Sequence, residues 1–93
     1  MRDDRQRLDK WLWFARFAKT RSLAARLIAD GYVRVNGQRA EAASKAVAVG
    51  DVVTVAAAHA TVAVRVVALG ERRGPAPEAR LLYADVAGGV APG

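Results

Sequence analysis

The sequence has 93 residues, of which 53% are hydrophobic and 26% are charged, with a net charge of +6 and no cysteine. A chain of this length forms one domain with a modest core, which leaves little room for a deep catalytic cleft. Composition excludes disulfides, thiolate metal sites and cysteine nucleophiles, and we see neither an apolar run of membrane-helix length nor a signal peptide. We therefore expect a cytoplasmic protein with no membrane partner.

The excess of positive charge lies in the first half of the chain. Residues 1–45 hold eleven Lys and Arg against five Asp and Glu, whereas residues 46–93 hold four of each kind. Clustered cations gain affinity for phosphates by releasing condensed counterions. This asymmetry favours a polyanionic partner over the alternative, a basic surface that is merely solvated.

The first helix is predicted over residues 9–18, after a flexible tail over residues 1–6. Most of its apolar side chains share one face: Leu8, Trp11, Leu12 and Ala15. Trp13 and Phe17 lie on a second face, where they either pack under the C-terminal segment or leave one ring exposed to stack on an unpaired base. Asp9 is an acid among cations, so we expect it to hold a nearby Arg or to favour the positive end of the helix.

The second helix is predicted to begin after Thr20, whose hydroxyl is a suitable N-cap, and to end before Gly31. Its apolar stripe consists of Leu23, Ala24, Leu27 and Ile28. Arg21 and Arg26 lie off this stripe and give the helix a cationic side. The alternating residues 32–35 then predict a strand, and Asn36-Gly37 predicts a type I′ hairpin turn because both turn residues need positive φ.

The rest of the chain predicts more strands and a short final helix. A return strand over residues 38–40 is followed by strands at 51–55 and 61–67, joined by a hairpin loop at 56–60. Residues 77–83 predict a short helix with Pro in its first turn, whose Leu82 and Tyr83 cover Trp13 or Phe17, and residues 87–93 are predicted to be disordered. The expected fold class is α+β, with two N-terminal helices on a small twisted antiparallel sheet.

Several separate blocks of this sequence resemble the RNA-binding domain named after ribosomal protein S4, also called the alpha-L motif. The blocks are Arg7-Leu8-Asp9-Lys10, Lys19-Thr20-Arg21-Ser22, Ala25-Arg26-Leu27-Ile28, Gly31 to Gly37, Ser44-Lys45 and Val49-Gly50-Asp51. One departure is Ala43, where the superfamily often has Pro before the Ser of this loop. The Trp11-Leu12-Trp13 run and Arg72-Arg73 are most similar to its ribosome-associated branch, the heat shock protein 15 family.

The resemblance implies an RNA-binding domain over residues 7–69, with its alpha-L core at about 7–57 and a C-terminal extension over 70–86 that packs on it. It also implies a protein that binds structured RNA, namely ribosomal RNA of the large subunit, and rescues stalled subunits that still hold a nascent chain under heat stress. We expect the protein to be a monomer. The family often has a longer basic C-terminal tail, which this sequence lacks.

The inventory of reactive side chains speaks against an enzyme. His59 is the only histidine and lies in an Ala-rich turn, and both serines lie within the basic motif. There is no paired-carboxylate, metal-ligand or phosphate-loop signature. We therefore expect neither catalytic residues nor a metal or cofactor.

The candidate RNA-binding residues come from both helices and from the hairpin, and the resemblance implies that they share one surface. They are Arg7, Lys10, Arg16, Lys19, Thr20, Arg21, Ser22, Arg26, Arg34, Asn36, Gln38, Arg39 and Lys45. Free backbone N–H groups at the start of the second helix add a phosphate site. Two alternatives stay open: an accessory subunit whose basic face meets an acidic protein, such as an RNA-modifying enzyme, and a nonspecific DNA binder.

Overall fold

The computed structural model describes residues 4–56 and 61–90, the last four of these by their backbone alone. The elements in chain order are β1 (Arg5–Arg7), α1 (Leu8–Phe14), α2 (Arg21–Ala29), β2 (Val33–Val35), β3 (Gln38–Arg39), β4 (Ala46–Ala48), β5 (Val52–Ala56), β6 (Thr61–Val66), α3 (Ala76–Ala79), a 3-10 turn η1 (Arg80–Leu82) and β7 (Tyr83–Val90). The predicted α+β class is confirmed. None of the described helices is long and apolar enough to cross a membrane.

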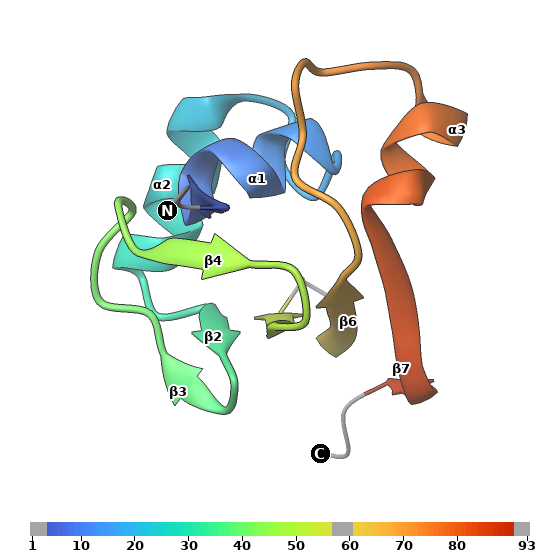
Figure 1. Cartoon of the computed structure of the whole chain (residues 1–93). Helices are drawn as coiled ribbons and strands as arrows, with labels where there is room; N and C mark the ends of the chain where they lie inside the picture. The colour runs from blue at the N-terminus through green and yellow to red at the C-terminus, as the bar shows by residue number, and fades with distance from the viewer. Residues whose placement is uncertain (1–3, 57–60, 91–93) are drawn as a thin grey trace.

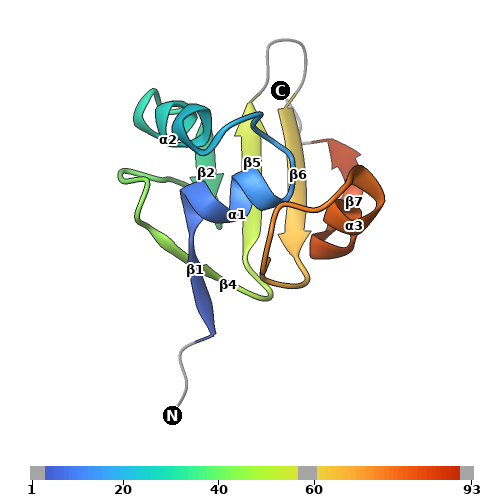
Figure 2. The same cartoon turned by 90° about the horizontal axis from the view of Figure 1, so that it is seen from above.

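Five strands form an antiparallel sheet in the order β3-β2-β5-β6-β7, and β1 pairs with β4 in a separate ribbon. Helices α1 and α2 lie side by side on one face of the large sheet, and α3 lies at its far end beside β7 (Figures 1 and 2). Alternation along β2 and β5 turns valines such as Val33 and Val53 toward the helices, where both are fully buried. The core thus lies between one face of the sheet and the helix pair.

Trp11 is the largest fully buried side chain, and it connects α1 to the C-terminal extension. Its indole N–H donates to the carbonyl of Ala68 at 3.0 Å, and its ring packs against Phe17 and Tyr83 with centroids 6.0 and 6.5 Å away. Phe17 and Tyr83 are themselves 4.9 Å apart. The prediction that Tyr83 covers Phe17 is therefore confirmed, and Phe17 is not a free stacking ring.

The two helices end in the same way but with different residues. The N–H of Tyr32 donates to the carbonyl of Leu27 and Gly31 takes a φ of 86°, which is the Schellman arrangement that a glycine favours. In α1 the N–H of Phe17 donates to the carbonyl of Leu12, and Arg16 holds the equivalent position with a φ of 66°. The predicted helix over 9–18 was therefore wrong at its end, because no glycine marks this stop.

The hairpin turn is as predicted, with Asn36 at φ 53° and Gly37 at φ 85° between β2 and β3. The apolar stripe of α2 was only partly right. Ala24 and Ile28 are fully buried, but Leu23 is 40% exposed. A helix of nine residues that contacts the core along one side leaves the edge of a broad stripe in solvent.

Within the described residues, strands extend closer to both ends than the sequence predicts. Arg5 and Gln6 belong to β1, whose partners are Ala46–Ala48, so the expected tail over 1–6 was wrong at these residues. The Gln6 side chain also donates to the Gly70 carbonyl at 2.8 Å and accepts from its N–H at 3.1 Å. Such long-range pairing has no local sequence signal.

At the other end, the helix predicted over 77–83 lies one residue earlier, since α3 begins at Ala76 and the 3-10 turn η1 that continues it ends at Leu82. The strand β7 then pairs with β6 and continues to Val90, which corrects the expectation of disorder from residue 87. The predictions for residues 91–93, for His59 and for most of the 56–60 loop concern positions outside the described residues.

Candidate nucleic-acid interface

The start of α2 is built by Thr20, as predicted. Its Oγ1 accepts a hydrogen bond from the N–H of Leu23 at 3.0 Å, and its backbone is extended, with φ −135° and ψ 160°. The N–H groups of Arg21 and Ser22 precede the first complete turn and have no acceptor within the helix. They therefore point forward from the positive end of α2, where an anion is favoured.

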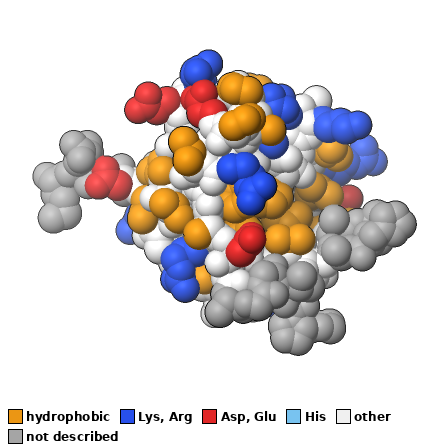
Figure 3. All heavy atoms as spheres, turned by 90° about the vertical axis from the view of Figure 1, so that its right-hand side faces the viewer, with side chains coloured by type: hydrophobic (Ala, Val, Ile, Leu, Met, Phe, Trp, Pro, Cys, Tyr) orange, Lys and Arg blue, Asp and Glu red, His pale blue; other side chains and the backbone are white. Residues whose placement is uncertain are grey.

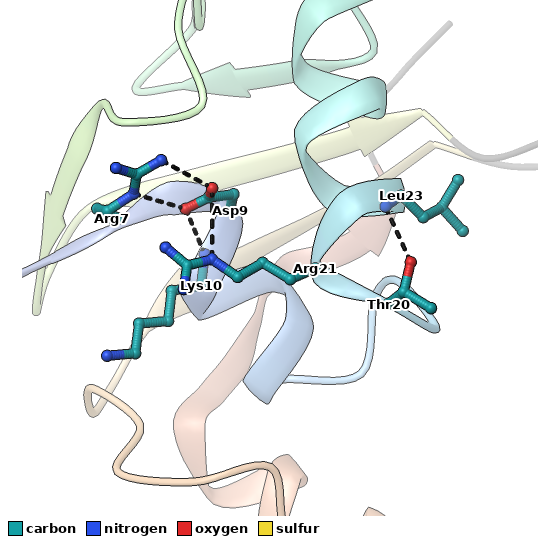
Figure 4. Close-up of polar contacts among 6 residues, drawn as sticks. All are labelled: Arg7, Asp9, Lys10, Thr20, Arg21 and Leu23. Atoms are coloured by element: carbon teal, nitrogen blue, oxygen red, sulfur yellow. Dashed lines mark hydrogen bonds and ion pairs between the residues drawn. The ribbon is translucent and has the colours of Figure 1, made fainter.

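Asp9 lies directly beside this helix start and holds two arginines, as Figure 4 shows. Arg7 donates to both of its carboxylate oxygens, at 3.1 and 3.0 Å, and the Nε of Arg21 lies 3.5 Å from Oδ2. The backbone N–H of Lys10 donates to Oδ1 at 2.7 Å. We call Arg7, Asp9, Lys10 and Arg21 the Asp9 cluster; it joins β1, α1 and α2.

Asp9 is buried, with only 3% of the residue exposed. The side chains of its partners Arg7 and Arg21 are 51% and 44% exposed. Burial alone would raise the pKa of Asp9, but the hydrogen bonds from Arg7, the charge of Arg21 and the Lys10 N–H outweigh it and lower the pKa. The same contact raises the pKa of Arg7. The Asp9 carboxylate is thus ionised near neutral pH, and three basic side chains surround this one acid.

The loop before β4 places a groove next to this cluster. The N–H of Asp9 donates to the Ala43 carbonyl at 3.2 Å, and the N–H of Leu8 donates to the Lys45 carbonyl at 2.8 Å. The groove has a volume of about 370 Å³ and is lined by Val35, Gln38, Arg39, Glu41, Ala42, Ser44 and Lys45. Of the predicted residues, Lys45 therefore lies at the start of α1, and Gln38 and Arg39 line the same groove.

The remaining hairpin residues have mainly structural contacts. Asn36 donates to Asp51 at 3.2 Å and accepts from the N–H of Val52 at 2.9 Å, so its side chain ties the turn to β5. Arg34 and Arg39 are direct cross-strand partners. Arg39 reaches back over Gly31 to donate to the Ala29 carbonyl at 3.3 Å, at the negative end of α2.

Two predicted residues of the helical region also lie away from the Asp9 cluster. Arg26 is five residues beyond Arg21, which on an α-helix is about 140° around and about 7.5 Å along the axis. Arg16 lies at the other end of α1, where its Nε donates to the Gly74 carbonyl at 2.8 Å. Lys19 and Ser22 are exposed next to the α2 start. The single surface predicted from the sequence is thus a compact centre with outlying cations.

The opposite end of the molecule has a different character. Figure 3 views the side that carries α3 and β7 and shows hydrophobic side chains across its middle, with Lys, Arg, Asp and Glu scattered among them. Leu81 of η1 is 71% exposed. Arg72 is paired with Glu78 at 2.8 Å. No cluster comparable to that around Asp9 lies among these described contacts.

Sequence reasoning missed Arg73, whose Nε donates to the Trp13 carbonyl at 3.2 Å. Arg72-Arg73 entered the sequence analysis only through the family resemblance, because 60 residues separate Arg73 from Trp13. It also missed Glu41 and Ala42 as groove residues. Their loop has no periodic pattern, so only the fold shows which side chains meet.

Comparison with known families gives a match to the segment that contains the Asp9 cluster and the groove. The family model for the S4 domain matches residues 6–53, just over half of the chain. A relative from Haemophilus influenzae described as a heat shock protein 15 homolog is 43% identical over 90 residues, which are 97% of this chain and 68% of the relative. The chain belongs to the heat shock protein 15 family of S4-domain proteins.

Other members of the heat shock protein 15 family agree with this assignment. Heat shock protein 15 of Escherichia coli K12 is 48% identical over 84 residues, or 90% of this chain and 62% of the relative. The chain thus spans 62–68% of the length of these two relatives. The solved heat shock protein 15 of Vibrio cholerae, described as trimeric, superposes with a TM-score of 0.85 at 44% identity, covering 91% of this chain and 85% of the other.

Proposed function

We propose that this S4-domain protein binds structured RNA through the Asp9 cluster, the start of α2 and the adjoining groove. The observation that carries the proposal is the buried carboxylate of Asp9, which fixes Arg7 and Arg21 beside the free N–H groups of α2. Planar guanidinium groups suit bidentate phosphate contacts. Two short elements read few base edges, so we expect recognition by the shape of the RNA backbone.

The test is RNA binding by single charge reversals that alter the total charge equally. Arg21→Glu removes a cluster member, whereas Arg65→Glu changes an exposed arginine on β6, whose Nη1 contacts the Gly50 carbonyl at 3.4 Å. We expect Arg21→Glu to weaken binding to an RNA hairpin far more than Arg65→Glu. Equal losses in two folded variants would show that net charge alone drives the binding.

Salt dependence gives an independent measure of the same interface. About six cations that neutralise phosphates predict a slope of about −4 to −5 for log K against log salt concentration. A DNA duplex of equal length is the control for a nonspecific phosphate binder. Equal affinity and slope for DNA and RNA would contradict recognition of RNA shape.

We further propose ribosomal RNA of the large subunit as the target, with rescue of stalled subunits under heat stress as the role. This step is supported by family membership rather than by a contact in the molecule. Co-sedimentation with separated ribosomal subunits at moderate salt tests it. Binding to the large subunit that Arg21→Glu abolishes supports the proposal, and failure to bind either subunit refutes the ribosomal role.

We propose that a single copy is enough to bind RNA, because β1, α1, α2 and the β3–β4 loop of one chain build the whole interface. The Vibrio cholerae relative is described as trimeric. Measuring the mass of the protein–RNA complex by light scattering decides whether one chain or three chains bind each RNA. A stoichiometry of three chains per RNA would refute the monomer.

A further inference from the structure

A second group of cations lies at the end of α1, where the helix meets the loop that precedes α3. Arg16 donates through Nε to the Gly74 carbonyl at 2.8 Å, and Arg73 donates through Nε to the Trp13 carbonyl at 3.2 Å. These reciprocal contacts join segments 58 and 60 residues apart. Both guanidinium groups are therefore held at one place, and we call Trp13, Arg16 and Arg73 the α1-end corner.

The two arginines keep most of their donors unused. Each is anchored through Nε, so both of its Nη groups are left without a partner among residues 4–56 and 61–86. No carboxylate in those ranges forms an ion pair with either one, and the neighbouring Glu78 is already paired with Arg72 at 2.8 Å. Two fixed guanidinium forks without a counter-charge favour an anion with several oxygens.

Trp13 supplies an aromatic ring at the same place. It is half-buried and stacks on Phe14, with centroids 5.3 Å apart and an interplanar angle of 27°. No other ring of the described residues packs on it, and its indole N–H has no acceptor there, unlike that of Trp11. Since Phe14 is only 4% exposed, Trp13 has a rigid support.

The backbone at Arg16 adds an independent observation. Its φ of 66° lies in the left-handed region, which a residue with a Cβ adopts at a cost. The equivalent position at the end of α2 is Gly31, which takes φ 86° without that cost. An arginine in the strained position is not the choice that stability favours, and strain of this kind is typical of functional sites.

We propose that the α1-end corner binds an unpaired nucleotide of the RNA held by the Asp9 cluster, with the base stacked on Trp13 and a phosphate accepted by Arg16 and Arg73. This inference rests on the proposed function. Bases within a duplex are already stacked and present no free face, so the nucleotide must lie outside a helix. Asp9 and Trp13 are four residues apart on α1, so the two sites lie about 6 Å from each other along the helix axis, which one RNA spans.

The experiment compares a blunt RNA hairpin with the same hairpin carrying a short single-stranded extension. The wild type binds the extended RNA more tightly by a factor of about 5 to about 160, the range expected for one stacked base. Trp13→Leu, which keeps an apolar side chain on Phe14, removes that gain and leaves binding of the blunt hairpin unchanged. Arg16→Gly with Arg73→Gln also removes the gain from the extension, although the loss of two charges weakens binding of both hairpins to a similar degree. Glycine fits the left-handed position, so the fold is retained.

Tryptophan fluorescence provides a second readout that a structural role would not affect. The chain has two tryptophans, and Trp11 is fully buried. A base stacked on Trp13 quenches part of the emission when the extended RNA is added. The blunt hairpin gives little quenching, and Trp13→Phe loses the response because only Trp11 then emits.

The outcomes separate this inference from the proposed function. Arg21→Glu weakens binding of both hairpins, because it acts on the shared duplex contact. Equal wild-type affinity for the two RNAs, without quenching, overturns the nucleotide site and leaves the proposed function standing. Quenching by an acidic peptide but not by the extended RNA overturns it in favour of a protein partner. Binding of neither hairpin by the wild type refutes both proposals.

Discussion

Replacing Asp9 by Asn separates the arrangement of charge at the interface from its amount. The substitution keeps the size of the side chain and an oxygen for the Lys10 N–H, but it removes the charge that holds Arg7 and Arg21. The net charge rises by one unit. A surface that binds RNA by total charge alone would therefore bind it more tightly.

The arrangement predicts the opposite. Ordering a long side chain on binding costs about 0.5–1.5 kcal/mol, so releasing two arginines costs about 1–3 kcal/mol of binding free energy. The extra positive charge of the variant improves the binding free energy by about 1 kcal/mol if it acts on a nearby phosphate in water. We expect RNA binding to weaken about fivefold, and by no more than about thirtyfold. The free energy of unfolding should fall by about 1–2 kcal/mol, discounted because both guanidinium groups are half exposed.

Fluorescence anisotropy with a labelled RNA hairpin measures the binding, and urea unfolding confirms that the variant is folded. Asp30→Asn is the matched control, since it makes the same change in net charge at the exposed C-cap of α2. It should bind RNA as tightly as the wild type or slightly more tightly. If Asp9→Asn behaves like Asp30→Asn, the fixed positions of Arg7 and Arg21 do not contribute, and our account of the cluster is wrong.

Three further outcomes follow from local contacts. The pKa of Asp9 is lower in the folded chain than in the unfolded chain. The ionised carboxylate therefore stabilises the fold fully above about pH 4, and this stabilisation is lost as the pH falls through the lowered pKa. Thermal melting at a series of pH values should show that the wild type loses part of its stability advantage over Asp9→Asn at about pH 3. Thr20→Ala removes the cap of α2 and should reduce the free energy of unfolding by about 1 kcal/mol in urea, with Thr20→Ser as the conservative control. Gly31→Ala should reduce the free energy of unfolding by more than about 1 kcal/mol. The φ of Gly31 is 86°, and a Cβ there would lie 3.1 Å from the Arg39 guanidinium. A variant as stable as the wild type would contradict this strain.

Local chemistry made α2 and the hairpin predictable. Thr20, Gly31 and Asn36-Gly37 each act within a few residues, through a cap or a positive φ, and the structure has each where the sequence predicts it. The partner role of Asp9 was also predicted, because a lone acid among arginines has few alternatives. The sequence did not predict which arginines pair with Asp9, because Arg21 reaches Asp9 only once α2 packs on α1.

Long-range pairing was not predictable in the same way. Gly88-Gly89 and the neighbouring small residues are typical of a disordered end, yet β7 is held by its register with β6. The end of α1 lacks the glycine that marks the end of α2, and Arg16 takes its place. The contact of Arg73 with Trp13 depends on how the extension returns to the helix, which no local pattern records.

The segment shared with other S4 domains and the segment that folds as a unit have different boundaries. The family match ends at residue 53, but β6 lies beyond it and supplies Val64 and Val66 to the fully buried core. The buried N–H of Trp11 finds its acceptor only at Ala68. A fragment cut at the family boundary would end within β5, lose β6 and leave an indole without its hydrogen bond. The inherited RNA-binding motif is therefore a part of the domain that depends on its extension, not an independent module within it.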